Sequence, residues 1–243
     1  MIAAKKGIMY LKPEGLPQNV LSFTTTRFSG FSSGEFSSLN FGYHVDDDEM
    51  SVTKNYEKLY EVFSLKKVLT LSQIHSNIIV DIDRDVHLLT GDGLVTRKKN
   101  VALGILTADC FNVQLVGNKM IANIHCGWKS IYSGILEECL KIFEMEQDTV
   151  RYAVVGPGIC AKCYEVNSEL VQKFISLINN NDIFLKNDGK FYLDLRKIIK
   201  LKLENFVESV IDLNYCTRCS GFLYSYRRFN KTGRLLSVLM KYE

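Results

Sequence analysis

Three short apolar runs follow one another in the middle of the chain, at residues 101–106, 112–116 and 120–124. Each run has the length and composition of a buried β-strand. Cys110 and His125, whose side chains bind metals well, follow the first and third runs closely. Because a polar side chain at the end of a buried strand points into a crevice at the sheet edge, these two residues are predicted to meet at one rim.

His75 is a third residue of this kind, and it precedes the strand-like residues 78–80. Two imidazoles and one thiolate suit zinc, and three protein ligands leave the fourth tetrahedral position open, as in catalytic zinc sites. The alternative is that Cys110 is a small buried hydrophobe and that each histidine is an ordinary hydrogen-bonded residue. The gaps between the three residues match no short zinc-finger pattern, so spacing leaves both interpretations open.

Several short motifs surround these three residues. They are Leu-Ser-Gln-Ile-His at 71–75, Gly-Asp-Gly-Leu-Val-Thr at 91–96, Thr-Ala-Asp-Cys at 107–110, His-Cys-Gly-Trp at 125–128, Gly-Pro-Gly-Ile at 156–159, Cys-Tyr-Glu-Val at 163–166, Tyr-Ser-Tyr-Arg-Arg at 224–228 and Thr-Gly-Arg at 232–234. In this order they resemble the YfiH family. That family was once called the laccase-domain or multicopper polyphenol oxidoreductase family and is now described as purine nucleoside phosphorylases.

Alternating buried strands and amphipathic helices indicate an α/β or α+β protein. The resemblance implies more, namely a four-layer α/β/β/α arrangement with mixed sheets, shared with cysteine hydrolases. It also implies that His75, Cys110 and His125 hold zinc in an enzyme that uses inorganic phosphate. The implied reaction converts adenosine, inosine, guanosine or methylthioadenosine to the free base and a ribose 1-phosphate. Adenosine deaminase activity is implied as a further property, since a metal-activated water can attack the amino-bearing carbon of adenine.

Two residues are candidates for substrate binding. Apolar residues with helical spacing predict one helix from about 127 to 145, whose N-terminus would favour an anion beside the metal site. Lys129 in its first turn adds a positive charge, where the family commonly has arginine with its fork geometry. In the resemblance, Asn40 falls in the substrate pocket, and a turn-organising asparagine is the alternative.

Two aspartates near the predicted site each have two interpretations. Asp109 is the nearest candidate general base, or it fixes its own loop. Asp92, between two glycines, either forms a turn or accepts a hydrogen bond from a metal-bound histidine. The turn is the simpler interpretation of Asp92. Acidic residues at 46–49 are interpreted as a helix start rather than a cation loop.

The chain departs from the family pattern at four positions. Tyr56, Lys129, Ser130 and Lys162 stand where the family usually has Arg, Arg, Gly and Cys, respectively. Tyr56 and Lys129 bear on substrate binding, since both replace a cation.

Two Cys-x-x-Cys pairs, at 160–163 and 216–219, suggest a structural zinc site. The stretch between them is far longer than in a zinc ribbon and contains two predicted helices, 168–178 and 195–207. The preferred role of the first pair is therefore to shape the backbone rather than to bind metal.

The tail is predicted to form a hairpin of residues 222–226 and 235–240. The three arginines near this turn either pair with acidic residues such as Glu165 or supply a positive field to the pocket. They are Arg227, Arg228 and Arg234.

Composition limits the functions open to the chain. Its 243 residues are 47% hydrophobic and 23% charged, and no Pro/Gly/Ser linker divides them, so one domain over 1–243 is predicted. A formal charge of +3 without a dense basic and aromatic run disfavours nucleic acid, and no apolar run suits a membrane span or signal peptide. Seven scattered cysteines favour reduced thiols. A cytoplasmic monomer or homodimer with a purine nucleoside and inorganic phosphate as partners is expected.

Three other functions stay open. Without metal, Cys110 becomes a thiolate nucleophile with His125 or His75 as its base, hydrolysing an amide or acyl bond. The older family name implies copper-dependent oxidation of phenols, but the chain has only four histidines and a multicopper cluster uses many more. Zinc is therefore the preferred cofactor and copper the alternative. A binding module without catalysis is the last possibility.

Overall fold

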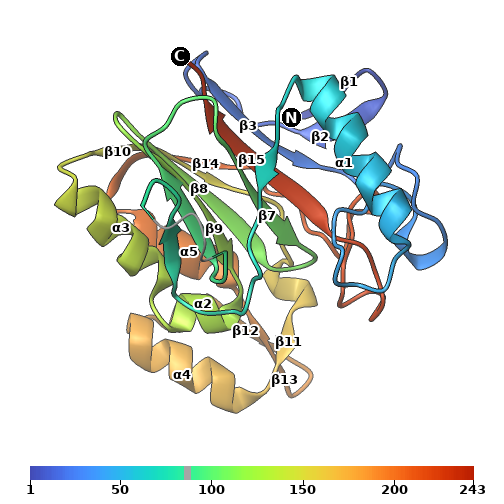
Figure 1. Cartoon of the computed structure of the whole chain (residues 1–243). Coiled ribbons are helices and arrows are strands. Elements are labelled where there is room, and N and C mark those ends of the chain that lie inside the picture. Colours follow the sequence, from blue (N-terminus) through green and yellow to red (C-terminus); the bar gives the residue numbers. More distant parts are fainter. Residues whose placement is uncertain (85–88) are drawn as a thin grey trace.

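Two six-stranded mixed sheets form the centre of the computed structural model, which describes residues 1–84 and 89–243 (Figure 1). The first sheet has the order β1 (Ile2–Lys5), β2 (Ile8–Leu11), β3 (Val20–Thr25), β15 (Leu235–Lys241), β7 (Ala102–Thr107) and β4 (Val68–Leu69). The second has the order β14 (Val207–Asp212), β10 (Val150–Val155), β8 (Phe111–Gly117), β9 (Ile121–Cys126), β6 (Gly93–Thr96) and β5 (Ile79–Asp81). A small third sheet has the order β11 (Glu165–Val166), β13 (Lys190–Leu193) and β12 (Phe184–Asn187).

Helices cover the outer faces of the two large sheets (Figure 1). On the first sheet lies α1 (Glu49–Phe63), and its apolar face packs against Phe23, Val68 and Val238. On the second lie α2 (Trp128–Tyr132), α3 (Ile135–Met145) and α5 (Leu195–Leu203). Helix α4 (Ser168–Ile178) contacts β13 of the small third sheet and, through Phe174, Tyr132 of α2. The four-layer α/β/β/α arrangement implied by the family resemblance is confirmed.

The facing sides of the two sheets are joined by apolar packing and by buried amides. Leu94, Leu103 and Leu239 pack between the sheets. The Asn123 side-chain N–H group donates to the carbonyl oxygens of Leu103 and Ser237 at 3.0 and 2.9 Å. A buried amide is costly unless it is hydrogen-bonded, so this contact fixes β9 against β7 and β15.

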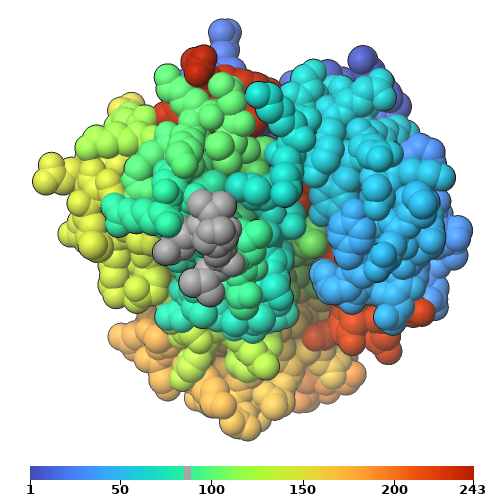
Figure 2. Space-filling view, in the orientation of Figure 1, coloured from blue at the N-terminus to red at the C-terminus, as the bar shows by residue number. Residues whose placement is uncertain are grey.

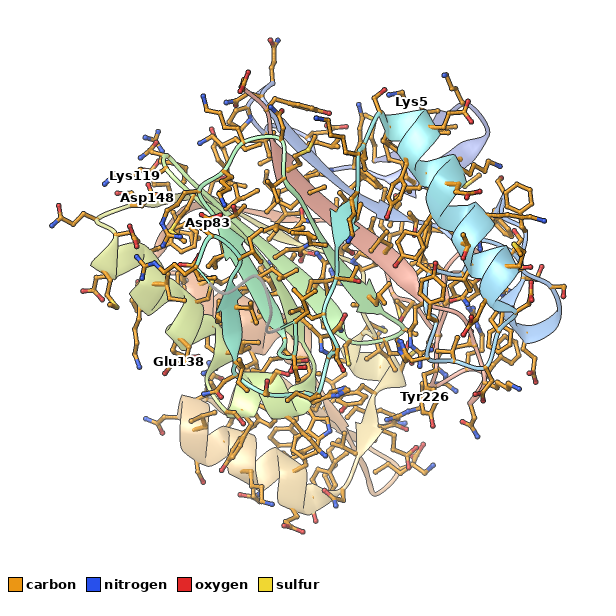
Figure 3. All side chains as sticks on the ribbon, viewed as in Figure 1. Lys5, Asp83, Lys119, Glu138, Asp148 and Tyr226 are labelled. Carbon is orange, nitrogen blue, oxygen red and sulfur yellow. The ribbon has the colours of Figure 1, made fainter. Side chains whose placement is uncertain are left out.

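The hairpin of β8 and β9 carries two of the three predicted metal-binding residues, Cys110 and His125, at one end. At its other end, both carboxylate oxygens of Asp148 accept main-chain N–H groups, from Asn118 at 2.8 Å and from Lys119 and Met120 at 2.9 Å (Figure 3). These bonds close the turn. They hold the register in which Asn112 pairs with His125.

The acidic stretch before α1 is a helix start, as predicted. Asp48 is the N-cap residue, and its side chain accepts the Ser51 N–H group at 2.8 Å. Such a cap satisfies one of the main-chain N–H groups that the first turn of a helix leaves without a partner.

Two sequence predictions about the fold are wrong. The helix expected from about 127 to 145 is two helices, α2 and α3, because Gly134 between them has a φ of 84°. The C-terminal hairpin does not form. Instead β15 pairs with β3 and β7 in the middle of the first sheet. Tyr224 is fully buried in an irregular segment and packs in the same apolar cluster as Leu235. No helix in residues 1–84 or 89–243 is both long and apolar enough to span a membrane.

Candidate metal centre

The structure brings His75, Cys110 and His125 together. Their ligand atoms all lie within 4.8 Å of one another, and Cys110 Sγ is 3.9 Å from His75 Nε2. His75 lies in the loop between β4 and β5, Cys110 directly precedes β8, and His125 lies within β9. The two imidazole rings meet edge to face, with centroids 4.9 Å apart. Three segments distant in sequence therefore present two nitrogens and one sulfur to a common point.

The donor set and its spacing fit a tetrahedral zinc ion. Bonds of about 2.3 Å to sulfur and about 2.0 Å to nitrogen place neighbouring donors roughly 3.6 Å apart. The sulfur-to-nitrogen distance of 3.9 Å between Cys110 and His75 is close to that value. Small side-chain rotations would complete the site without main-chain movement.

Asp92 holds both histidine segments in place. This fully buried carboxylate lies 2.8 Å from His125 Nδ1 and accepts the main-chain N–H groups of His75 at 3.0 Å and Ser76 at 2.6 Å. The preferred interpretation of Asp92 as a turn former misses this role. The structure shows the contact of the alternative, in which Asp92 pairs with His125 Nδ1 and leaves the other ring nitrogen to face Cys110, as needed if His125 were to bind a metal.

Cys110 and His125 shift each other's pKa in opposite directions. Burial raises the pKa of the Cys110 thiol, but the charge of His125 and hydrogen bonds from both histidines outweigh burial and lower the pKa to about 6. Burial likewise lowers the pKa of His125, and the Cys110 thiolate with Asp92 outweighs it and raises the pKa to about 9. Between these values a thiolate faces an imidazolium, so Cys110 is already in the form that binds metals.

The backbone at Gly127 lies so close to His75 and Cys110 that there is no room for a side chain at this position. A Cβ atom added to Gly127 would lie 2.8 Å from His75 Cδ2 and 3.1 Å from Cys110 Sγ. His75 and Asp109 both have positive φ, at 59° and 95°. Such conformations cost on the order of 1–3 kcal/mol each and concentrate at functional sites.

Asp109, the candidate general base, has both carboxylate oxygens engaged. Oδ1 accepts the Thr217 hydroxyl and Oδ2 accepts the Arg227 main-chain N–H group, each at 2.5 Å. Asp109 borders the cavity but is nearly buried. These contacts are those of a residue that fixes its loop, which was the second interpretation of Asp109.

His75, Cys110 and His125 line a cavity of about 820 Å³. Aromatic side chains line it from four segments of the chain: Phe41, Tyr43, Tyr56, Tyr164 and Tyr226. Tyr226 is labelled in Figure 3, and Figure 2 shows the surface hollowed between the blue residues of the N-terminal part and the teal and green residues of the middle of the chain. A cavity of this size accommodates a small organic ligand.

Cations in the cavity wall come from the C-terminal motifs. Arg227 and Arg234 both line the cavity. The Arg227 guanidinium also lies 5.0 Å from the centre of the Tyr164 ring and donates to the Glu165 carbonyl oxygen at 2.9 Å. Arg228 instead donates to the carbonyl oxygens of the preceding loop. The sequence left pocket and structural roles open for these arginines, and the structure divides the roles among them.

The two predicted substrate-binding residues lie outside the cavity lining. Asn40 is fully buried, its amide nitrogen donates to Asp47 at 2.8 Å, and its oxygen accepts the Arg234 N–H group at 2.7 Å. Lys129 is exposed on α2, with Nζ 5.7 Å from the centre of the Trp128 ring.

Of the other departures from the family pattern, Tyr56 lines the cavity and donates to the Phe41 carbonyl oxygen at 3.0 Å. Ser130 is buried and Lys162 is exposed. His44 also lines the cavity, and sequence reasoning missed it. Only its residue type could have drawn attention to it, because it lies in a loop without a recognisable motif.

Comparisons with known proteins agree with this architecture. Residues 21–241 match the family model described as multi-copper polyphenol oxidoreductase laccase. The purine nucleoside phosphorylase of Haemophilus influenzae is 32% identical over 234 residues, covering 92% of this chain and 95% of that protein. The purine nucleoside phosphorylase of Clostridium acetobutylicum is 35% identical over 235 residues, covering 91% of this chain and 95% of that protein.

Solved structures show the same fold. A DUF152 protein of Neisseria meningitidis superposes with a TM-score of 0.86 at 30% identity, covering 96% of this chain and 99% of that one. YlmD from Geobacillus stearothermophilus superposes with a TM-score of 0.85 at 24% identity, covering 99% of this chain and 98% of that one. At this identity the likeness shows the fold alone.

Fold and site together define a four-layer α/β/β/α protein with a His-His-Cys centre in the wall of a cavity that aromatic side chains line. The chain belongs to the YfiH family, whose family model carries the multi-copper polyphenol oxidoreductase laccase description. The resemblance drawn from the sequence motifs is confirmed.

Proposed function

We propose that this protein is a zinc-dependent purine nucleoside phosphorylase. The observation that carries the proposal is the convergence of His75, Cys110 and His125 in the wall of a cavity that is also lined by aromatic rings and two arginines. The names of the relatives from H. influenzae and C. acetobutylicum support the reaction class. Adenosine, inosine, guanosine and methylthioadenosine are the proposed substrates.

The cavity offers separate contacts for the purine base of the nucleoside and for inorganic phosphate. A purine stacks on the tyrosine rings, an interaction worth about 1–3 kcal/mol per base in nucleic-acid sites. Inorganic phosphate is held by Arg227 and Arg234, because guanidinium groups form strong paired hydrogen bonds with phosphate. These arginines line the cavity and Lys129 does not, so we place the phosphate contact with them.

Zinc, when bound, supplies a Lewis acid that can polarise an oxygen of phosphate or ribose. Asp92 keeps His125 oriented toward the centre, and Asp109 holds the loop that carries Cys110. Phosphorolysis then depends mainly on positioning: the phosphate oxygen must reach the anomeric carbon while the base leaves.

The experiment is base release from inosine and adenosine by the purified protein, with and without inorganic phosphate. Release should require phosphate and should stop when a chelator removes the metal. Equal release in phosphate-free buffer would contradict phosphorolysis. Ammonia release from adenosine in the same samples tests the proposed deaminase activity, and metal analysis distinguishes zinc from the copper of the older family name.

A thiol hydrolase is the second candidate, and the thiolate–imidazolium pair of Cys110 and His125 favours it. In that case metal-free protein would hydrolyse an amide or acyl substrate, and iodoacetamide labelling of Cys110 would abolish the activity. If the protein kept full activity in chelator and lost it when Cys110 was labelled, the thiol hydrolase would be favoured over the zinc enzyme.

A further inference from the structure

A second group of metal-competent side chains lies away from the His-His-Cys centre. The sulfur atoms of Cys160, Cys163, Cys216 and Cys219 all lie within 4.8 Å of one another, and those of Cys163 and Cys219 are 3.4 Å apart. We propose that these four cysteines bind a structural zinc ion, which ties the loop after β10 to the loop after β14.

Sheet topology explains why the two pairs meet. Strands β10 and β14 are parallel neighbours, so their C-terminal ends lie side by side. One cysteine pair follows each strand, and Gly158 and Cys216 continue the pairing as a parallel bridge. In the sequence, the long stretch between the two pairs argued against a shared site. In the fold, the chain returns after this stretch to the same edge of the sheet.

Each Cys-x-x-Cys pair is already folded as a tight turn. The Cys163 N–H group donates to the Cys160 carbonyl oxygen at 3.0 Å, and the Ser220 N–H group donates to that of Cys216 at 3.0 Å. Such turns place both sulfurs of a pair on one side. Four sulfurs around a zinc ion at about 2.3 Å lie roughly 3.8 Å from one another, which this cluster approaches without main-chain rearrangement.

The surroundings suit a centre that carries negative charge. Four thiolates around one Zn²⁺ leave a net charge of −2, and Cys216 Sγ accepts the Cys160 N–H group at 3.3 Å. Each pair also encloses an exposed basic residue, Lys162 or Arg218. The Arg228 guanidinium donates to the carbonyl oxygens of Arg218 and Ser220, on either side of Cys219.

The cluster is coupled to the wall of the cavity. Thr217, between the two cysteines of the second pair, donates its hydroxyl to Asp109 at 2.5 Å. Ile159, next to the first pair, donates its N–H group to the Asp109 carbonyl oxygen at 2.9 Å. A metal that fixes both pairs therefore also fixes the loop that carries Cys110.

Two disulfides are the chemical alternative for four neighbouring cysteines. A disulfide requires its sulfurs to approach to about 2.05 Å, with the loss of two hydrogens for each bond to an oxidant. Zinc binding needs no oxidant and releases the thiol protons. Intact mass under native and alkylating conditions separates the two outcomes.

The test is zinc content of the full-length protein purified in reducing buffer. Wild type should contain two zinc ions per chain. Cys110→Ala should contain one, the Cys163→Ser/Cys219→Ser double variant should contain one, and the combination none. Cys139→Ala, which removes a cysteine buried in α3, is the control and should retain two.

A second measurement leaves the cluster intact in case the double variant fails to fold. Cys110→Ala reconstituted with cobalt should show the strong sulfur-to-metal charge-transfer bands of a four-thiolate site, and Cys219→His should shift these bands while retaining the metal. Unchanged zinc content in a folded Cys163→Ser/Cys219→Ser variant would overturn the proposal. So would the absence of thiolate bands in Cys110→Ala, or a wild-type mass lower by two hydrogens per pair.

Discussion

His125 Nδ1 lies 2.8 Å from Asp92 Oδ1, and this buried contact decides which ring nitrogen faces Cys110. Asp92→Asn keeps the shape of the side chain. It weakens the hydrogen bonds that this side chain accepts from His125 and from the main-chain N–H groups of His75 and Ser76. Zinc affinity should fall about 10–100-fold, as for other carboxylates that orient a metal-binding histidine. Titration against a chromophoric chelator measures this, and an unchanged affinity would show that Asp92 only shapes the loop.

Asp92→Asn should also lower the free energy of unfolding of the metal-free protein. Buried N–H groups that lose a charged hydrogen-bond acceptor cost about 1–3 kcal/mol. Urea unfolding in chelator measures the change independently of the metal.

Gly127→Ala tests the tight packing at the centre without removing a ligand. The new methyl group would meet His75 Cδ2 at 2.8 Å and Cys110 Sγ at 3.1 Å, so both ligands must shift. We expect a loss of activity of about tenfold or more, since small displacements at a reacting centre can cost 100-fold. Gly221→Ala is the matched control, because its methyl group would meet nothing within 4 Å. Equal activity of the two variants would contradict the close packing.

Arg227→Gln and Arg234→Gln test the phosphate contact. Each removes a charged donor from the cavity wall, and hydrogen bonds to charged groups are worth about 1.5–3 kcal/mol, or roughly 10–150-fold. The KM for phosphate should rise by this factor, with a smaller effect on the KM for nucleoside. Lys129→Gln, at an exposed position outside the cavity, should change neither. A larger effect of Lys129→Gln than of the arginine variants would restore the phosphate contact predicted from the sequence.

The rate of alkylation of Cys110 in metal-free protein should depend on pH with a midpoint near 6. Only the thiolate reacts, so the rate should rise as pH passes the lowered pKa of about 6 and then level off. The imidazolium of His125 should persist until pH approaches 9. Cys139, whose pKa burial raises, should stay unreactive over this range. A Cys110 midpoint near the ordinary thiol value of about 8.5 would rule out the ion pair.

Much of the fold was predictable because the central strands are buried on both faces. In a four-layer protein such strands are mostly apolar, as at 101–106, 112–116 and 120–124. Asn112, Gln114 and Asn123 are polar residues that these strands also bury. The meeting of Cys110 with His125 followed from the positions of both residues near strand ends. Breaking of the helix at Gly134 was not predictable, since the apolar spacing continues across it.

The remaining features depend on long-range pairing, which a single sequence does not reveal. The two cysteine pairs are far apart in the chain, and only the parallel pairing of β10 with β14 brings them together. Similarly, Asn40 is buried outside the cavity lining and accepts the N–H group of Arg234, which lies near the other end of the chain.

The most direct test of the proposed function is the identity of the sugar product formed from inosine. Phosphorus NMR of a reaction with wild-type protein and inorganic phosphate should show ribose 1-phosphate in an amount equal to the hypoxanthine released. Cys110→Ala, which lacks a ligand of the His-His-Cys centre, should form none. Free ribose in place of ribose 1-phosphate would contradict phosphorolysis at this centre.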